Sequence, residues 1–329
     1  MERRNLAYEA AVMHYVQGET MESIARRLGV SRSTVSRLVK NARDAGYVQI
    51  SLHPPKEMVN SLGARISQTF GIRTHVVPVP FGANETRRLT SVATMAGIVI
   101  SELIEPNVVI GVAWGNTVSA VSDHLVPKST TGATIVQLNG AAHKNSTGIP
   151  YASEIMEAFG HAYGAAVVQF PVPAFFDYAA TRDALWKERS IASVRELQIN
   201  ADIAVFGVGA LEGKIPSQVY AGGYLSPDEL GSLTREGVVG DICTVLLRAD
   251  GSWEDLALNH RASGPTPDLL RGIKRRVCVV SGVEKVRPLL AALRAGVVTD
   301  LIIDEDAASH LEEVTFEHER KISRHRNLS

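Results

Sequence analysis

Near the start of the chain, apolar residues recur at the 3.6-residue spacing of a helix in two short, consecutive stretches. The first stretch has its apolar face at Ile24, Ala25 and Leu28, and the second at Val35, Leu38, Val39 and Ala42. Thr20 and Ser31 precede the two stretches, and each hydroxyl can accept a bond from a free backbone N–H at a helix start. With Gly29 as the turn-former between them, the pattern predicts a helix-turn-helix.

The opposite face of the second predicted helix is polar and cationic. Ser33, Ser36, Arg37 and Lys40 recur there at the same spacing, with Arg32 and Thr34 near the helix start. From Ser23 to Arg43 there are six Lys or Arg residues and no acidic residue. A solvated helical hairpin could carry such charge, but the charge, spacing, caps and turn together favour base edges and phosphates in a major groove. The predicted contacts to double-stranded DNA are therefore Arg32, Ser33, Thr34, Ser36, Arg37 and Lys40.

From residue 72 onward the pattern changes to short apolar runs that alternate with amphipathic stretches. The runs predicted as strands are Thr74–Val79, Val108–Val112, Ala133–Leu138, Ala165–Val168, Ile203–Val208, Cys243–Leu247, Val277–Val280 and Leu301–Ile303. The predicted helices are Arg87–Leu103, Thr117–Leu125, Ala152–Tyr163, Arg182–Leu197, Lys285–Arg294 and Ala307–Glu313. This alternation predicts a mostly parallel, Rossmann-like α/β sheet that is covered by helices on both faces.

Two further features divide the chain. Leu6–Gln17 is predicted as an amphipathic helix that packs on the helix-turn-helix and ends at Gly18. Val48, Ile50 and Leu52 alternate with polar residues as a short strand would, and His53-Pro54-Pro55 then breaks the pattern. We therefore predict an all-α domain over residues 1–53, a linker with a connecting helix (Glu57–Phe70) over 54–72, and the α/β domain over 73–329.

Composition and charge fit this division. The 329 residues carry a formal net charge of −1, but residues 1–55 hold eight basic and five acidic residues, so the first domain is basic and the remainder mildly acidic. Cys243 and Cys278 are the two cysteines, too few for a disulfide framework or a zinc site. The N-terminus lacks an apolar signal-peptide core, and no stretch has the length of a membrane span. These observations predict a cytoplasmic protein that does not enter a membrane.

Five turns after predicted strands contain glycine next to polar residues: Gly111–Thr117, Gln137–Gly140, Gly207–Gly209, Gly240-Asp241 and Ser281–Lys285. In open parallel sheets, ligands bind outside the carboxyl ends of the strands, so these turns predict one polar pocket. Amides near Thr117 could hold an anion at a helix start, and Asn139 and Asp241 could exchange hydrogen bonds with hydroxyls. Lys285 would add a positive charge, unless it is simply a solvated lysine in the first turn of a helix.

Other chemistry is not indicated. The run Gly207–Gly213 has one residue too many for the dinucleotide fingerprint, and Gly213-Lys214 is followed by Ile215 rather than Ser or Thr. The histidines His161, His260 and His310 form no metal-ligand spacing, and no nucleophile elbow is present. We therefore predict no cofactor, no metal and no catalytic residue.

The order of these parts resembles the SorC-type sugar-binding transcriptional regulators over essentially the full length. The matching motifs are Ser31–Val39, Ala42–Gly46, Gly111–Thr117, Gln137–Gly140, Gly207–Gly209, Gly240-Asp241, Lys285, Leu290–Gly296 and Leu301–Glu305. The resemblance implies a phosphosugar-isomerase-like effector domain in a homo-oligomer, dimer or tetramer, whose DNA affinity responds to a sugar, polyol or sugar phosphate. It places Gly115, Asn116 and Thr117 in the family's phosphate-binding turn. The full set of predicted effector-binding residues is Gly115, Asn116, Thr117, Asn139, Gly209, Asp241 and Lys285.

The predicted parts of the chain are compatible with two functions. The first is a regulator of a carbohydrate catabolic operon, repressor or activator. The second is an active sugar-phosphate isomerase or deaminase fused to a DNA-binding module, which needs an acid/base pair at the open-chain sugar. Asp241 and His143 are the candidate pair, but no spacing joins them. Because likeness of fold does not carry activity, the sequence favours the regulator and a protein that is not an enzyme.

Overall fold

Thr20 and Ser31 begin helices, as their hydroxyls predict. In the computed structural model each hydroxyl accepts a hydrogen bond from the backbone N–H three residues further on, at 3.2 Å in both cases. The helices are α2 (Met21–Leu28) and α3 (Arg32–Asp44). Gly29 ends α2 with a φ of +66°, a conformation that glycine adopts without strain.

The first helix packs against this pair. It runs as α1 (Glu2–Ala11) and continues as a π-helical turn, Val12–Val16, so it starts earlier than predicted. The residues buried at the centre of this unit are Ala10, Ile24, Ala25, Val35 and Val39. Small and branched apolar side chains let the helices approach closely, and the predicted helix-turn-helix is confirmed.

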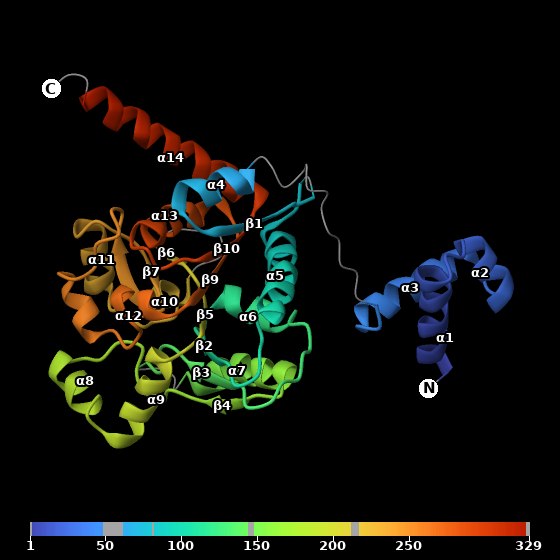
Figure 1. Cartoon of the computed structure of the whole chain (residues 1–329), viewed down its shortest axis with the longest axis horizontal. Coiled ribbons are helices and arrows are strands. Elements are labelled where there is room, and N and C mark those ends of the chain that lie inside the picture. Colours follow the sequence, from blue (N-terminus) through green and yellow to red (C-terminus); the bar gives the residue numbers. More distant parts are fainter. Residues whose placement is uncertain (1, 49–61, 81, 144–147, 212–216, 327–329) are drawn as a thin grey trace. The chain divides into compact units, whose positions relative to one another are not determined.

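The structure describes residues 2–48, 62–80, 82–143, 148–211 and 217–326, in two compact units, Met1–Met58 and Val59–Ser329 (Figure 1). Ile50, Leu52 and the predicted boundary at His53-Pro54-Pro55 lie outside the described residues. Of the predicted connecting helix, the described part is α4 (Leu62–Phe70), whose Ile66 is buried in the core of the larger unit.

The larger unit is built on a parallel sheet of seven strands, which confirms the predicted fold class. Their order is β1 (Arg73–Val77), β10 (Asp300–Asp304), β9 (Arg275–Val280), β5 (Ile203–Gly207), β2 (Val109–Val112), β3 (Thr134–Gln137) and β4 (Ala166–Val168). From β2 the chain proceeds to β3 and β4 on one side and then returns to β5 on the other side. The neighbouring strands β2 and β5 therefore form the switch point of the sheet, and ligands bind outside the carboxyl ends of the strands at such a point.

Helices cover both faces because successive strand residues point to opposite sides. Ile302 belongs to one apolar cluster, whereas Leu301 and Ile303 belong to the other. The helices of the first face are α5 (Glu85–Glu102), α6 (Asn116–Ser122) and α7 (Ile149–Tyr163). Those of the second face are α4, α9 (Arg189–Ile199), α13 (Val286–Arg294) and α14 (Glu305–Arg326).

Two predicted elements differ from the structure. The strand predicted over Cys243–Leu247 is instead the turn and second strand of a hairpin formed by β7 (Val238–Ile242) and β8 (Val245–Arg248). Cys243 and Thr244 take left-handed φ values of +46° and +71°, which their side chains do not signal. With β6 (Gly209–Ala210) the hairpin makes a small antiparallel sheet.

The single helix predicted over Arg182–Leu197 is two helices, α8 (Ala179–Leu185) and α9. The chain leaves α8 at Trp186, whose ring packs against Phe170 and Phe176. Among the described residues, the short α-helices that were not predicted are α10 (Gln218–Ala221), α11 (Pro227–Arg235) and α12 (Pro267–Gly272).

Asp300, at the start of β10, accepts hydrogen bonds from residues of the two neighbouring strands β1 and β9. This arrangement predicts how the stability of the protein depends on pH. The fully buried carboxylate accepts hydrogen bonds from Arg73 at 2.6 and 3.0 Å and from Arg275 at 2.9 Å. Burial opposes its ionisation, but the bonds from Arg73 and Thr299 and the charge of Arg275 lower the pKa of Asp300. Its stabilisation is therefore present at neutral pH and is lost as pH falls through that lowered pKa.

We expect Asp300→Asn to lower the free energy of unfolding at pH 7 by about 1.5–3 kcal/mol, the value of a hydrogen bond to a charged group. Urea titrations at pH 7 and pH 3 measure the effect, and the difference from the parent protein should shrink at pH 3. An equal difference at both pH values would contradict the role of the ionised carboxylate.

Candidate functional site

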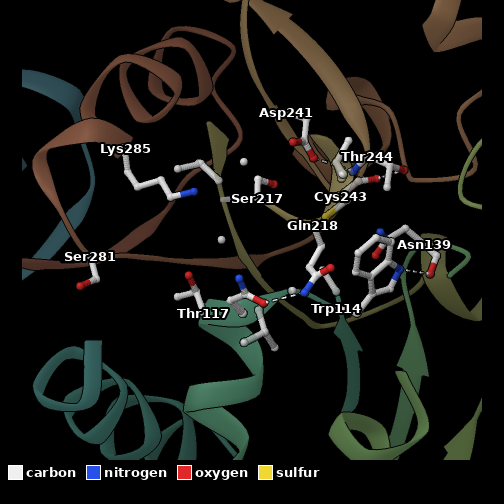
Figure 2. A pocket seen from close by; sticks show the side chains of 18 of the residues that line it. Trp114, Thr117, Asn139, Ser217, Gln218, Asp241, Cys243, Thr244, Ser281 and Lys285 are labelled. Atoms are coloured by element: carbon white, nitrogen blue, oxygen red, sulfur yellow. Dashed lines mark hydrogen bonds between the residues drawn. The ribbon is translucent and has the colours of Figure 1, made fainter. Parts of the chain in front are cut away.

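The turns after β2, β3, β5 and β9 meet the hairpin β7–β8 around one pocket. It holds about 750 Å³ of space including its open mouth. All seven residues predicted to bind an effector line this pocket, among them Gly115, Asn116, Gly209 and the labelled Thr117, Asn139, Asp241 and Lys285 (Figure 2). Residues far apart in the sequence are thus brought together at the switch point of the sheet.

The two turns beside β2 and β3 are held to each other by Trp114. Its indole N–H donates to the carbonyl oxygens of Asn139, at 3.1 Å, and Gly140, at 2.8 Å. Gly115 follows and is the N-cap residue directly before α6. Its φ of +149° is a backbone conformation that a residue with a side chain would adopt only with strain. The Gln218 amide donates to Asn116 Oδ1 at 3.1 Å from across the pocket. These contacts fix the mouth of the pocket around the start of α6.

Asp241 lies on β7 beside Gly209 and is almost fully buried. Its Oδ2 accepts the backbone N–H of Thr244 at 3.1 Å, while Oδ1 has no hydrogen-bond partner among the described residues. Burial raises the pKa of Asp241, and the neighbouring Tyr220 hydroxyl, the Thr244 amide and the Lys285 charge oppose this rise. The Tyr220 hydroxyl is near the carboxylate but does not meet hydrogen-bond geometry.

Lys285 is buried, so the alternative of a solvated lysine is wrong. It ends a 3₁₀ turn, Val283–Lys285, directly before α13. The pKa of Lys285 is lowered by burial, and the charges of Asp241 and Glu284 offset only part of this effect. A buried ammonium facing an open pocket is suited to hold an anionic ligand group.

Asp304, at the carboxyl end of β10, holds the turn that carries Lys285. Its Oδ2 accepts the Gly282 N–H at 2.7 Å, and its Oδ1 accepts from Arg88 at 2.8 Å. Gly282 has a φ of +98°, and a Cβ there would lie 2.6 Å from the Glu284 carboxylate. Asp304 of β10 and Arg88 of α5 therefore position Lys285, and neither residue is close to it in the sequence.

Sequence reasoning missed several residues of the pocket wall: Glu85, Leu89, Ser217, Gln218, Cys243, Thr244 and Glu284. Glu284 lies within the predicted Ser281–Lys285 turn and could have been included from that alone. His143, the candidate acid/base partner of Asp241, does not line this pocket. It contacts the Tyr224 ring, with centroids 4.5 Å apart.

The predicted DNA-contacting residues form an exposed face of α3. Arg32, Ser33, Ser36, Arg37 and Lys40 are exposed, and Thr34 is half-buried. The Thr34 hydroxyl lies 2.9 Å from Ser31 Oγ, so it takes part in the helix cap. Buried Val35 and Val39 fix the rotation of the helix, which leaves this cationic face free in the N-terminal unit.

Gly209 offers a direct steric test of the pocket. A Cβ at this position would lie 1.8 Å from Asp241 Oδ1 and 2.9 Å from Ser217 Oγ, so Gly209→Ala must displace the carboxylate. We expect a loss of about 1–3 kcal/mol in stability, seen as a lower melting temperature. Gly231→Ala in α11 is the matched control, because its Cβ meets nothing within 4 Å. Equal melting of the Gly209 variant and the parent protein would contradict the packing described here.

Two features are absent from the part of the chain that the structure describes. No group of three or more His, Cys, Asp or Glu side chains there could hold a metal ion. None of its helices combines the length and the apolar character needed to cross a membrane.

Comparisons with known proteins agree with both units. Residues 55–311 match the family "Putative sugar-binding domain", and residues 3–49 match the "Homeodomain-like domain". The deoxyribonucleoside regulator of Bacillus subtilis (strain 168) is 31% identical over 313 residues, which are 94% of this chain and 98% of that protein.

Two solved structures are also similar. A domain of a possible sugar-binding transcriptional regulator from Arthrobacter aurescens TC1 is 49% identical, with a TM-score of 0.73 over 79% of this chain and 99% of that one. The full-length sorbitol operon regulator SorC from Klebsiella pneumoniae has a TM-score of 0.75 at 22% identity, over 93% of this chain and 98% of that one. At that identity, the second likeness shows the shared fold.

Proposed function

The chain belongs to the SorC-type family of sugar-binding transcriptional regulators, and from this membership we propose that it regulates a carbohydrate catabolic operon. A sugar, polyol or sugar phosphate bound in the pocket controls its affinity for a double-stranded DNA operator. One observation carries the proposal: the same chain joins an exposed cationic recognition helix to a pocket lined by every predicted effector residue.

The DNA-binding part rests on the exposed face of α3. Arg37 and Lys40 can contact a guanine edge or a phosphate, and Ser33 and Ser36 can contact bases or the backbone. A single small helical module binds DNA weakly. We therefore propose a homo-oligomer, a dimer or tetramer in the cytoplasm, that presents paired recognition helices to two half-sites.

The effector part rests on the chemistry of the pocket wall. Thr117, Asn139 and Asp241 suit hydroxyl groups, and buried Lys285 suits an anion such as a phosphate. The names of the relatives refer to a deoxyribonucleoside and to sorbitol, which supports a carbohydrate-derived effector. Because these relatives are named as regulators and His143 lies outside the pocket, we propose binding rather than turnover at this site.

The test has two stages. Operator sequences are first selected from a random duplex library with the purified full-length protein, and sugars, polyols and their phosphates are screened by thermal shift, since a ligand of the native state raises apparent stability. Operator affinity is then measured with and without each stabilising compound. Failure to select any duplex, or an operator affinity that no stabilising compound changes, would overturn the proposed function.

A further inference from the structure

Three charged residues of the pocket wall are carried by two segments that are far apart in the sequence. Glu85 belongs to the first turn of α5, and Glu284 and Lys285 belong to the 3₁₀ turn before α13. Because these segments offer both acidic and basic groups, a neutral or a charged ligand can interact with them. A ligand that favours one arrangement of the two segments over another shifts them toward that arrangement.

Asp304 joins both segments to the start of α14. Its Oδ1 accepts from Arg88 of α5 at 2.8 Å, and its Oδ2 accepts at 2.7 Å from Gly282, directly before the 3₁₀ turn. Oδ1 also accepts the Ala307 N–H at 3.1 Å, which caps the first turn of α14. Arg88 reaches Asp306, in the same turn of α14, at 2.6 Å. Since Asp304 is fully buried and the loss of a donor there is costly, the two segments and the start of α14 move together.

α14 in turn holds α4, the first described element on the C-terminal side of the N-terminal unit. The Arg65 guanidinium of α4 donates twice to the Glu312 carboxylate of α14, with 2.9 Å between Nη2 and Oε2. Ile66 of α4 and Leu311 of α14 are buried in the same apolar cluster. Figure 1 shows α4 beside α14. A bidentate pair fixes orientation as well as distance, so α4 follows α14.

We propose that the Arg65–Glu312 ion pair couples occupancy of the pocket to the affinity for DNA, with Asp304 as the positioning residue between the pocket and this pair. The contacts lead from the two pocket segments to Asp304, along α14 and across the ion pair to α4. From α4 the chain continues N-terminally to the unit that carries the recognition helix. This inference rests on the proposed function, because it assigns the means by which the same pocket controls operator binding.

The test measures the coupling itself. Operator affinity of the full-length protein is determined with and without the one probe that changes it most among erythritol, sorbitol, 2-deoxyribose and their terminal monophosphates. The ratio of the two affinities is the coupling ratio, typically about 5- to 150-fold. Arg65→Glu replaces the ion pair by two like charges, and the coupling ratio should fall by about two- to fivefold. Probe affinity of the DNA-free protein should stay within about twofold, since neither Arg65 nor Glu312 lines the pocket.

Exchange of the two charges distinguishes coupling from damage to the fold. Arg65→Glu combined with Glu312→Arg restores an ion pair between the helices, and the coupling ratio should return to that of the parent protein. Glu312→Ala should lower the ratio. Its matched control is Asp255→Ala, which removes the carboxylate partner of another surface arginine, Arg248, and should leave the ratio unchanged.

Asp304→Asn tests the contact nearer to the pocket. The amide keeps one acceptor oxygen but loses the charge that faces Arg88, so the turn before Lys285 is no longer fixed. Probe affinity should fall about tenfold and the coupling ratio should fall with it, whereas Arg65→Glu changes the ratio alone. If this buried substitution prevents folding, the surface variants of Arg65 and Glu312 still decide the proposal.

An unchanged coupling ratio in Arg65→Glu, or a ratio that the exchanged pair does not recover, would overturn the role of the ion pair and leave the proposed regulator intact. A loss of probe affinity in Arg65→Glu as large as the loss of coupling would also overturn it, because the pair would then act on the pocket itself. Failure of all six probes and of every stabilising compound to change operator affinity would overturn the proposed function instead.

Discussion

Lys285→Ala is expected to shift the response of operator binding to effector concentrations about 10- to 150-fold higher. The ammonium group is buried, donates to no described residue and faces the pocket, so its removal takes away a charge-assisted hydrogen bond worth about 1.5–3 kcal/mol. Effector affinity should fall about 10- to 150-fold, whereas operator affinity without effector should stay close to that of the parent protein. Operator binding measured across an effector titration gives both quantities.

Lys274→Ala is the matched control for this experiment, since it removes an exposed lysine from the same unit. Thr117→Val keeps the shape of the pocket wall and removes one hydroxyl, so it should weaken the effector less than Lys285→Ala does. A Lys285 variant that still responds at the original effector concentration would show that the anionic group lies elsewhere.

Arg37→Ala should weaken operator binding by about 1–3 kcal/mol for each recognition helix that contacts DNA, or about 5- to 150-fold for one helix. The side chain is exposed at the centre of the cationic face of α3, and buried Val35 and Val39 hold the helix in this orientation. Lys40→Ala, as a phosphate contact, should weaken binding to all sequences alike and reduce the salt slope by about one.

Arg235→Ala serves as the control for lost charge, because Arg235 is an exposed residue of the larger unit. Gel-shift titrations at several salt concentrations distinguish the variants. Unchanged affinity of Arg37→Ala at moderate salt would mean that another face of the N-terminal unit contacts DNA.

The sequence predicted what depends on local chemistry. Thr20 and Ser31 cap their helices, because a cap needs a hydroxyl at one position and a free N–H three residues later. The parallel sheet followed from the alternation of apolar runs and helices, and the pocket from the rule that ligands bind at the carboxyl ends of strands. Whether the pocket residues bind an effector remains a prediction for the experiments above.

Features that depend on distant residues could not be predicted. Cys243 and Thr244 have the composition of a strand, but they form a left-handed turn packed against Gly264, where a Cβ would lie 1.7 Å from the Cys243 carbonyl oxygen. Lys285 has the local sequence of a solvated helix start, and its burial follows from a turn held by Asp304. In both cases tertiary contacts override the local preference.

The wide spacing of the pocket residues along the chain has a consequence for synthesis on the ribosome. The core of the N-terminal unit draws on residues 7–48, whereas the pocket is complete only when Lys285 has emerged. Domains generally fold as units in the order in which they are made. The DNA-reading helices therefore exist before effector control does. Under the proposed function, a nonsense mutation between positions 48 and 285 would therefore leave a fragment that keeps helix α3 but lacks a complete effector pocket.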